Sequence, residues 1–159
     1  MEIFKETVDF SAHDVLRGYQ GGYFKVLVSP EQTDGKMALI DISLPRGVDP
    51  PMHIHTREDE TFYLLEGEIT FFVGEAIIKT KAGDAVFGPR MVPHRFVVES
   101  ECSRFLTLIT PGHFVEYFQE FSYPIVGKPV VATPQGPPPA ELIEQITNQL
   151  LVKYGVLFG

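Results

Sequence analysis

Apolar and polar residues alternate along residues 22–110 in short runs, separated by segments rich in Gly, Pro and Asp. An alternation with this period is typical of β-strands that have one buried face. It predicts strands over Tyr23–Ser29, Met37–Leu44, Met52–His55, Glu60–Glu66, Glu68–Val73, Ala76–Lys81, Ala85–Phe87, His94–Glu99 and Arg104–Thr110. The segments between them, such as PEQTDG and KAGD, carry residues that accept turn dihedral angles. Many short strands with this punctuation predict an all-β fold, and a jelly-roll β-barrel is the architecture we expect.

The pattern changes beyond Thr110. Gly112–Phe121 has apolar residues at helical spacing, and Ala140–Tyr154 places Leu142, Ile143, Ile146, Leu150 and Tyr154 on one stripe. We expect two short C-terminal helices packed on the barrel, with Gly155 ending the second. Residues 127–139 contain five prolines and read as a linker. Residues 1–21 show no clear period. The predicted organisation is an N-terminal arm (1–21), a barrel (22–111) and a C-terminal helical segment (112–159).

Composition and charge restrict the class of protein, its partners and its compartment. A chain of 159 residues with 44% hydrophobic residues fits one globular domain. The net charge of −8 argues against nucleic acid and anionic membranes as partners. The N-terminus resembles no secretory signal, no apolar run is long enough to span a membrane, and Cys102 is the single cysteine. We therefore expect a cytoplasmic protein without an intrachain disulfide.

Three histidines and a glutamate are the candidate chemistry. His53 and His55 are two residues apart on a predicted strand, so their side chains point to the same face. Glu60 begins the next strand, and His94 follows a turn rich in Gly and Pro. Imidazoles and a carboxylate are ligands for a divalent transition metal and leave coordination positions open for substrate. A single buried histidine is more often hydrogen-bonded to protein, but this combination favours a metal site.

These residues resemble the motifs of the cupin superfamily. Gly47, five residues, His53-Ile54-His55, four residues, Glu60, six residues and Gly67 reproduce the first motif without departure. Gly83, Pro89 and His94 match the second motif, whereas Met91 and Val98 replace its inner glycine and its asparagine. The resemblance implies a single jelly-roll barrel in which His53, His55, Glu60 and His94 bind one metal ion. Met91 puts the tightness of the turn before His94 in question.

The length, the stretch RFLTLITPGHFVEYFQEF and the ending KYGVLFG are similar to small quercetin-dioxygenase-like cupins. That narrower resemblance implies a metal-dependent dioxygenase acting on a small phenolic or enolic substrate, and family members of this size suggest a homodimer. Two other functions stay open: a metal-containing binding protein for small molecules without turnover, and a non-redox isomerase or lyase.

The donor set suits Fe, Mn, Ni, Cu or Zn rather than Mg or Ca. Glu60 is expected either to bind the metal or to accept a proton from the substrate. Its neighbours Arg57, Glu58 and Asp59 read as a solvated turn, so the formal charge of the loaded site would be +2 from the metal and −1 from Glu60. That net positive charge favours an anionic group on the substrate.

Alternation also predicts the walls of the substrate pocket. The side chains that share a face with the ligands, or that cover them from the next strand, are Phe62, Leu64, Phe71, Val73, Phe96 and Val98. The expected pocket is apolar and nearly free of hydrogen-bond donors. Such a pocket excludes water from an open metal and suits oxygen chemistry on an organic substrate.

Overall fold

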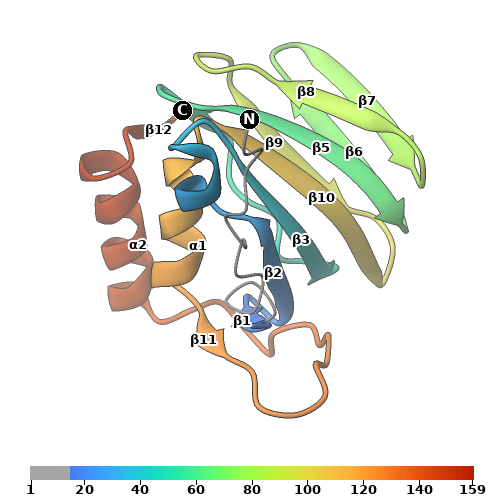
Figure 1. Cartoon of the computed structure of the whole chain (residues 1–159). Coiled ribbons are helices and arrows are strands. Elements are labelled where there is room, and N and C mark those ends of the chain that lie inside the picture. Colours follow the sequence, from blue (N-terminus) through green and yellow to red (C-terminus); the bar gives the residue numbers. More distant parts are fainter. Residues whose placement is uncertain (1–14) are drawn as a thin grey trace, which may run out of the picture.

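Two β-sheets dominate the computed structural model, which describes residues 15–159 (Figure 1). The larger sheet has the order β11-β1-β2-β3-β10-β5-β8. Its strands are β1 (Arg17–Tyr19), β2 (Gly22–Val28), β3 (Ala38–Pro45), β5 (Asp59–Glu66), β8 (Ala85–Gly88), β10 (Cys102–Thr110) and β11 (Tyr123–Pro124). The smaller sheet has the order β12-β4-β9-β6-β7. Its strands are β4 (His53–His55), β6 (Glu68–Val73), β7 (Ala76–Lys81), β9 (His94–Val98) and β12 (Val156–Phe158).

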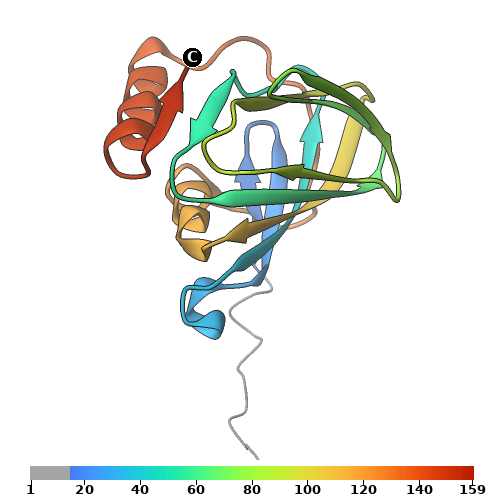
Figure 2. The ribbon, with the colours of Figure 1, turned by 90° about the horizontal axis from the view of Figure 1, so that it is seen from above.

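Every strand that the alternation predicts is present, and the largest shift is at β10, which begins at Cys102 rather than Arg104. Neighbouring strands in both sheets pair antiparallel. The predominance of β-structure is therefore confirmed. The sheets face each other, as seen from above in Figure 2.

Alternate side chains of the strands fill the space between the sheets. In β5, in β10 and in the first half of β3, burial alternates along the strand, and the buried side chains include Ile40, Ile42, Phe62, Leu64 and Phe105. Burying a side chain of this size contributes roughly 1.5–3 kcal/mol to stability. The same alternation turns Glu60 inward, because it shares a face with Phe62 and Leu64. Packing of these apolar neighbours therefore directs the Glu60 carboxylate into the interior, although a charged side chain gains nothing from burial itself.

The helices lie on one side of the sheets (Figures 1 and 2). The short 3-10 helix η2 (Pro30–Thr33) follows β2, and η3 (Gly112–Phe114) continues into α1 (Val115–Glu120). Phe114, Val115 and Tyr117 are buried, so this segment has an apolar face turned away from solvent. The second helix, α2 (Ala140–Val152), ends two residues before the predicted limit at Tyr154. Gly155 has a φ of 67° and leads into β12.

The segments expected to flank the barrel also contribute strands. Residues 17–19 form β1 and pair with β2 and β11, whereas residues 1–14 of the expected arm lie outside the described residues. Gln20 and Gly21, with φ of 48° and 80°, form the two-residue turn between β1 and β2. Positive φ at both positions is the geometry favoured in tight hairpins. At the other end, β12 pairs with β4, opposite His53 and His55. Among residues 15–159, no helix has the length and apolar character needed to cross a bilayer.

Candidate metal centre

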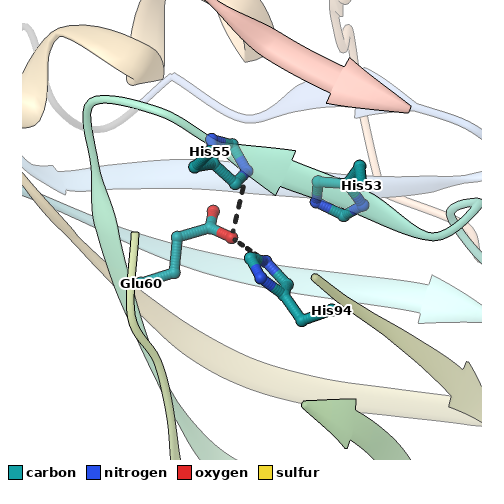
Figure 3. A group of neighbouring side chains, drawn as sticks. All are labelled: His53, His55, Glu60 and His94. Atoms are coloured by element: carbon teal, nitrogen blue, oxygen red, sulfur yellow. Dashed lines mark hydrogen bonds and ion pairs between the residues drawn. The ribbon is translucent and has the colours of Figure 1, made fainter. Parts of the chain in front are cut away.

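The structure brings the four predicted ligands together. His53 and His55 lie on β4, His94 on β9 and Glu60 on β5, so both sheets contribute to the cluster (Figure 3). One potential ligand atom from each residue lies within 4.8 Å of the others. Ligand atoms about 2.0–2.2 Å from a common ion are at most about twice that distance apart. The observed spread is therefore close to what one ion requires.

Strand pairing explains the assembly. His53 is directly opposite His94 in the β4–β9 pair, and alternation points His55 in the same direction as His53. His55 and His94 are 1% and 3% exposed, and Glu60 is 5% exposed. Glu60 Oε2 lies 3.3 Å from His55 Nε2 and 3.1 Å from His94 Nε2 (Figure 3). A carboxylate this deeply buried needs compensating positive charge, which a protonated imidazole or a cation provides.

The charge state of each ligand follows from its surroundings. Burial lowers the pKa of His53 to about 4, so this imidazole is neutral and available as a ligand at neutral pH. Burial also opposes charge on His55, but the Glu60 and Glu58 carboxylates outweigh it and raise its pKa to about 9. Burial opposes the charge of Glu60 as well, yet His55 and His94 hold its pKa well below the usual range. In the metal-free protein a proton on His55 thus neutralises Glu60, and a bound cation would take its place.

Backbone carbonyls orient two of the three imidazoles. His53 Nδ1 lies 2.8 Å from the Pro51 carbonyl oxygen, and His94 Nδ1 lies 3.2 Å from that of Val92. Each Nδ1–H donates to its carbonyl, so Nε2 is the ring nitrogen left to face a metal; without a metal, His94 Nε2 lies against Glu60 Oε2. Metal-binding histidines commonly donate their second ring N–H in this way.

At His55, the Glu58 carboxyl group lies beside Nδ1, where His53 and His94 each have a backbone carbonyl. The Glu58 side chain is buried, at 4% exposure, and Oε2 lies 3.4 Å from His55 Nδ1. Neither atom has a hydrogen-bond partner with good geometry among the described residues, so the two unsatisfied atoms face each other. The prediction that Glu58 belongs to a solvated turn is wrong. Thr56 and Arg57 donate to the carbonyls of Gly155 and Lys153, which fixes the C-terminal segment against the turn that contains Glu58.

Glu58 is thus a second buried carboxyl group at the site, in addition to Glu60. The donor set, the cluster's dimensions and the facing pair of unsatisfied atoms together fit a divalent transition metal.

Met91, which replaces the glycine of the motif, adopts a left-handed conformation in the turn before His94. Met91 has a φ of 65° and its side chain is 61% exposed. Its N–H donates to the His55 carbonyl oxygen at 2.8 Å, and Arg90 binds Asp59 through its backbone N–H and its guanidinium. These contacts hold the turn on the ends of β4 and β5, and thereby position His94.

We expect Met91→Gly to stabilise the protein by about 0.5–1 kcal/mol. A left-handed conformation costs a side-chain-bearing residue roughly 1–2 kcal/mol, and glycine gives back about 0.4–1 kcal/mol through the flexibility of the unfolded chain. Urea denaturation of the two proteins measures the difference. Met91→Ala is the control and should stay near wild type; a glycine variant no more stable than the alanine variant would contradict the argument.

A cavity of about 740 Å³ opens on the cluster. Its aromatic wall comes from Phe62, Phe96, Phe105, Phe114 and Phe118. The C-terminal segment closes another side through the proline-rich residues 134–138 and the face of α2 that carries Ile143, Ile146 and Leu150. The apolar stripe of α2 therefore faces the cavity in part, and Leu142 and Ile143 are 39% and 46% exposed.

The predicted pocket residues divide into two groups. Phe62 and Phe96 line the cavity. Leu64, Phe71 and Val98 are buried in the core, Val73 packs against it, and none of these four lines the cavity. The cavity is also more polar than expected, because its lining includes Tyr19, Gln20, Asp49, Thr107, Tyr117 and Thr147. A signal for Tyr19 and Gln20 was present in the sequence: Gln20-Gly21 directly before the first predicted strand can form a hairpin turn, which would have extended the sheet into the expected arm.

Fold and site together define the class of protein: a two-sheet, mostly β protein with a buried centre of three histidines and one glutamate. Residues 41–109 match the family model of the cupin domain. Together with the fold and the cluster, this match supports a member of the cupin superfamily.

Two kinds of relative support this assignment. Quercetin 2,3-dioxygenase from Bacillus subtilis (strain 168) is 26% identical over 111 residues, which cover 70% of this chain and 33% of that protein. The chain thus spans about a third of the length of this curated relative. The structure of KdgF from Halomonas sp. has a TM-score of 0.55 at 20% identity, over 70% of this chain and 94% of that one. A variant of Bacillus subtilis oxalate decarboxylase has a TM-score of 0.60 at 22% identity, over 78% and 34%. Both structures show likeness of fold.

Proposed function

We propose that the protein is a mononuclear metal-dependent dioxygenase that acts on a small phenolic or enolic substrate. The observation that carries the proposal is a buried cluster of His53, His55, Glu60 and His94 that opens on a largely apolar cavity of about 740 Å³. This volume is in the range of small-molecule sites. The likeness to a quercetin 2,3-dioxygenase supports the reaction class. We also propose that the sheets form a jelly-roll barrel over residues 22–111, flanked by 1–21 and 112–159, and that the protein is a cytoplasmic homodimer.

The three histidines would hold a divalent Fe, Mn, Ni, Cu or Zn ion through Nε2. When bound, such an ion supplies a Lewis-acidic centre at which an enolate or phenolate oxygen and O2 can be brought together. Glu60 Oε2 is the described carboxylate atom nearest to His55 and His94, so it is positioned either to complete the ligand set or to accept the substrate's hydroxyl proton. Phe62, Phe96 and Phe114 exclude water from the same space.

A binding protein without turnover is the second candidate. Glu60 is already engaged by two imidazoles, Glu58 faces His55, and Asp49 accepts the Val98 N–H at 2.9 Å. Among the described residues that line the cavity, no further carboxylate is left as an uncommitted base. If Glu60 serves only as a ligand, the site would hold a metal and a small molecule without the proton acceptor that catalysis requires.

The first test is the metal content of the purified protein, measured by elemental mass spectrometry. We expect close to one transition-metal ion per chain, and its loss in His53→Ala/His94→Ala, because two imidazole ligands are removed. His113→Ala is the matched control, since His113 is exposed and outside the cluster. Circular dichroism verifies that each variant is folded.

The identity of the metal then directs the functional assay. Fe, Mn, Ni or Cu favours oxygen chemistry with phenolic and enolic compounds. Zinc that also supports full or anaerobic activity favours isomerase or lyase chemistry instead. A folded protein that contains no metal and takes none up would overturn the proposed enzyme.

A further inference from the structure

A polar subsite interrupts the apolar wall of the cavity. It consists of Tyr19 on β1, Gln20 in the following turn and Tyr117 on α1, all of which line the cavity. The hydroxyl oxygens of Tyr19 and Tyr117 are 3.2 Å apart, and Gln20 Nε2 donates to the Tyr19 hydroxyl at 3.1 Å. Both tyrosines are buried, at 7% and 6% exposure. The polar atoms are thus gathered at one place in the wall.

The hydrogen-bond count at this subsite leaves one proton without an acceptor. Each tyrosine hydroxyl has one proton to donate. If Tyr117 donates to Tyr19, the Tyr19 proton has no acceptor among the described residues; if Tyr19 donates, the Tyr117 proton has none. Burial raises the pKa of both tyrosines, so both hydroxyls keep their protons at neutral pH. A buried donor without an acceptor is costly unless a ligand or water satisfies it.

The subsite and the histidine cluster are separated by one aromatic ring. Phe114 packs edge-on against His55, with ring centroids 4.5 Å apart, and stacks on Tyr117 at 5.2 Å and an interplanar angle of 11°. The cavity therefore has two polar positions, the metal-binding cluster and the tyrosine pair, with aromatic surface between them. A ligand that satisfies both needs an oxygen at each position and a flat, apolar body.

We propose that Tyr19, Gln20 and Tyr117 form a hydrogen-bond-donating subsite that binds a second oxygen of the substrate, remote from the oxygen held at the histidine cluster. The inference deepens the proposed function and rests on it for the first oxygen. It assigns the substrate to hydroxylated aromatic compounds that carry oxygen atoms at two separated positions. A two-carbon diacid is disfavoured, because it has no apolar body to cover the aromatic wall between the two positions.

Matched flavonols test the subsite. The probes are 3-hydroxyflavone, which has the enolic end alone, and its 4′-hydroxy and 7-hydroxy derivatives, which each add one distal oxygen. Binding is measured by calorimetry without oxygen, on wild type and on Tyr19→Phe/Tyr117→Phe. We expect wild type to bind at least one derivative about 2- to 10-fold more tightly than 3-hydroxyflavone, as one additional hydrogen bond allows. The double variant should bind the probes equally, with its affinity for 3-hydroxyflavone unchanged.

Tyr63→Phe is the control, because Tyr63 is exposed on β5 and does not line the cavity. It should retain the wild-type preference. Either single variant would leave one hydroxyl free to donate, so if the double variant is not folded, the 4′-methyl and 7-methyl analogues replace it on wild type; they have no distal oxygen and should bind no more tightly than 3-hydroxyflavone. A wild type without preference for either derivative, a preference that survives in the double variant, or the absence of binding by all three probes would each overturn the subsite.

Metal content measured on the same preparations separates the two proposals. Protein that contains no metal yet shows the preference through Tyr19 and Tyr117 would overturn the enzyme and support the subsite. Protein that contains metal but lacks the preference would overturn the subsite and leave the metal centre in place.

Discussion

Glu60→Gln is expected to lower turnover by at least about 100-fold while the protein still binds metal. A general base typically contributes about 100- to 10,000-fold to a rate, and the amide cannot accept the substrate's proton at neutral pH. The three imidazoles remain, so a folded protein should still load when metal is supplied in excess. Turnover is measured with the best substrate of a phenolic and enolic panel, beside metal content on the same sample.

Glu66→Gln is the matched control, since Glu66 ends the same strand, is exposed and pairs with Arg104 rather than with a histidine. It should leave both quantities unchanged. Turnover near wild type in metal-loaded Glu60→Gln would remove the catalytic role of Glu60. If no substrate is found while a panel compound raises the thermal stability of wild type, the protein is a receptor.

Glu58→Met is expected to weaken metal binding about 10- to 100-fold without destabilising the metal-free protein. Loss of a group that orients a metal-bound histidine typically has this effect on affinity. The carboxylate is buried beside His55 Nδ1 without a well-formed hydrogen bond, so burying it has a cost that an apolar side chain of similar size avoids. A positioning residue would thus lower metal affinity and leave the stability of the metal-free protein intact, whereas a purely structural residue would lower that stability first.

Metal affinity is measured by competition with a chelator, and stability by urea denaturation of the metal-free protein. Glu58→Gln is the graded comparison: it keeps an oxygen acceptor for His55 Nδ1 but removes the charge, so its loss of affinity should be smaller. Equal metal affinity in wild type and Glu58→Met would show that Glu58 does not act through His55. A large loss of stability in the metal-free variant would assign Glu58 a structural role instead.

Local periodicity explains why the strands and the ligand cluster could be predicted from sequence. A strand directs alternate side chains to opposite faces, so the spacing of His53 and His55 already places both on one face. The run that begins at Glu60 likewise predicts that this carboxylate shares the inner face of Phe62 and Leu64, and the structure confirms that burial. The spacing of the second motif identified His94 as a further ligand. Alternation alone could not predict its pairing with His53, because the two residues are far apart in sequence.

The pocket could not be predicted in the same way. Alternation says which side chains face inward, but an inward residue either packs against the opposite sheet or borders a cavity. Leu64 and Val98 do the former, and Phe62 and Phe96 do the latter. The difference depends on the distance between the sheets at each position, and on what closes their open end.

The sequence by itself determined the β-rich class, the strand positions and the candidate ligands, because each depends on a periodicity or spacing read over a few neighbouring residues. Only the tertiary structure decided the surroundings of the site. Tyr19 and Tyr117 are 98 residues apart in sequence, and their hydroxyls meet because α1 packs near the first hairpin. Glu58 looks like part of a solvated charged run, and it is buried where the C-terminal segment is bound to the turn that contains it. Burial of a polar group depends on which distant segment covers it, and local sequence does not encode that partner.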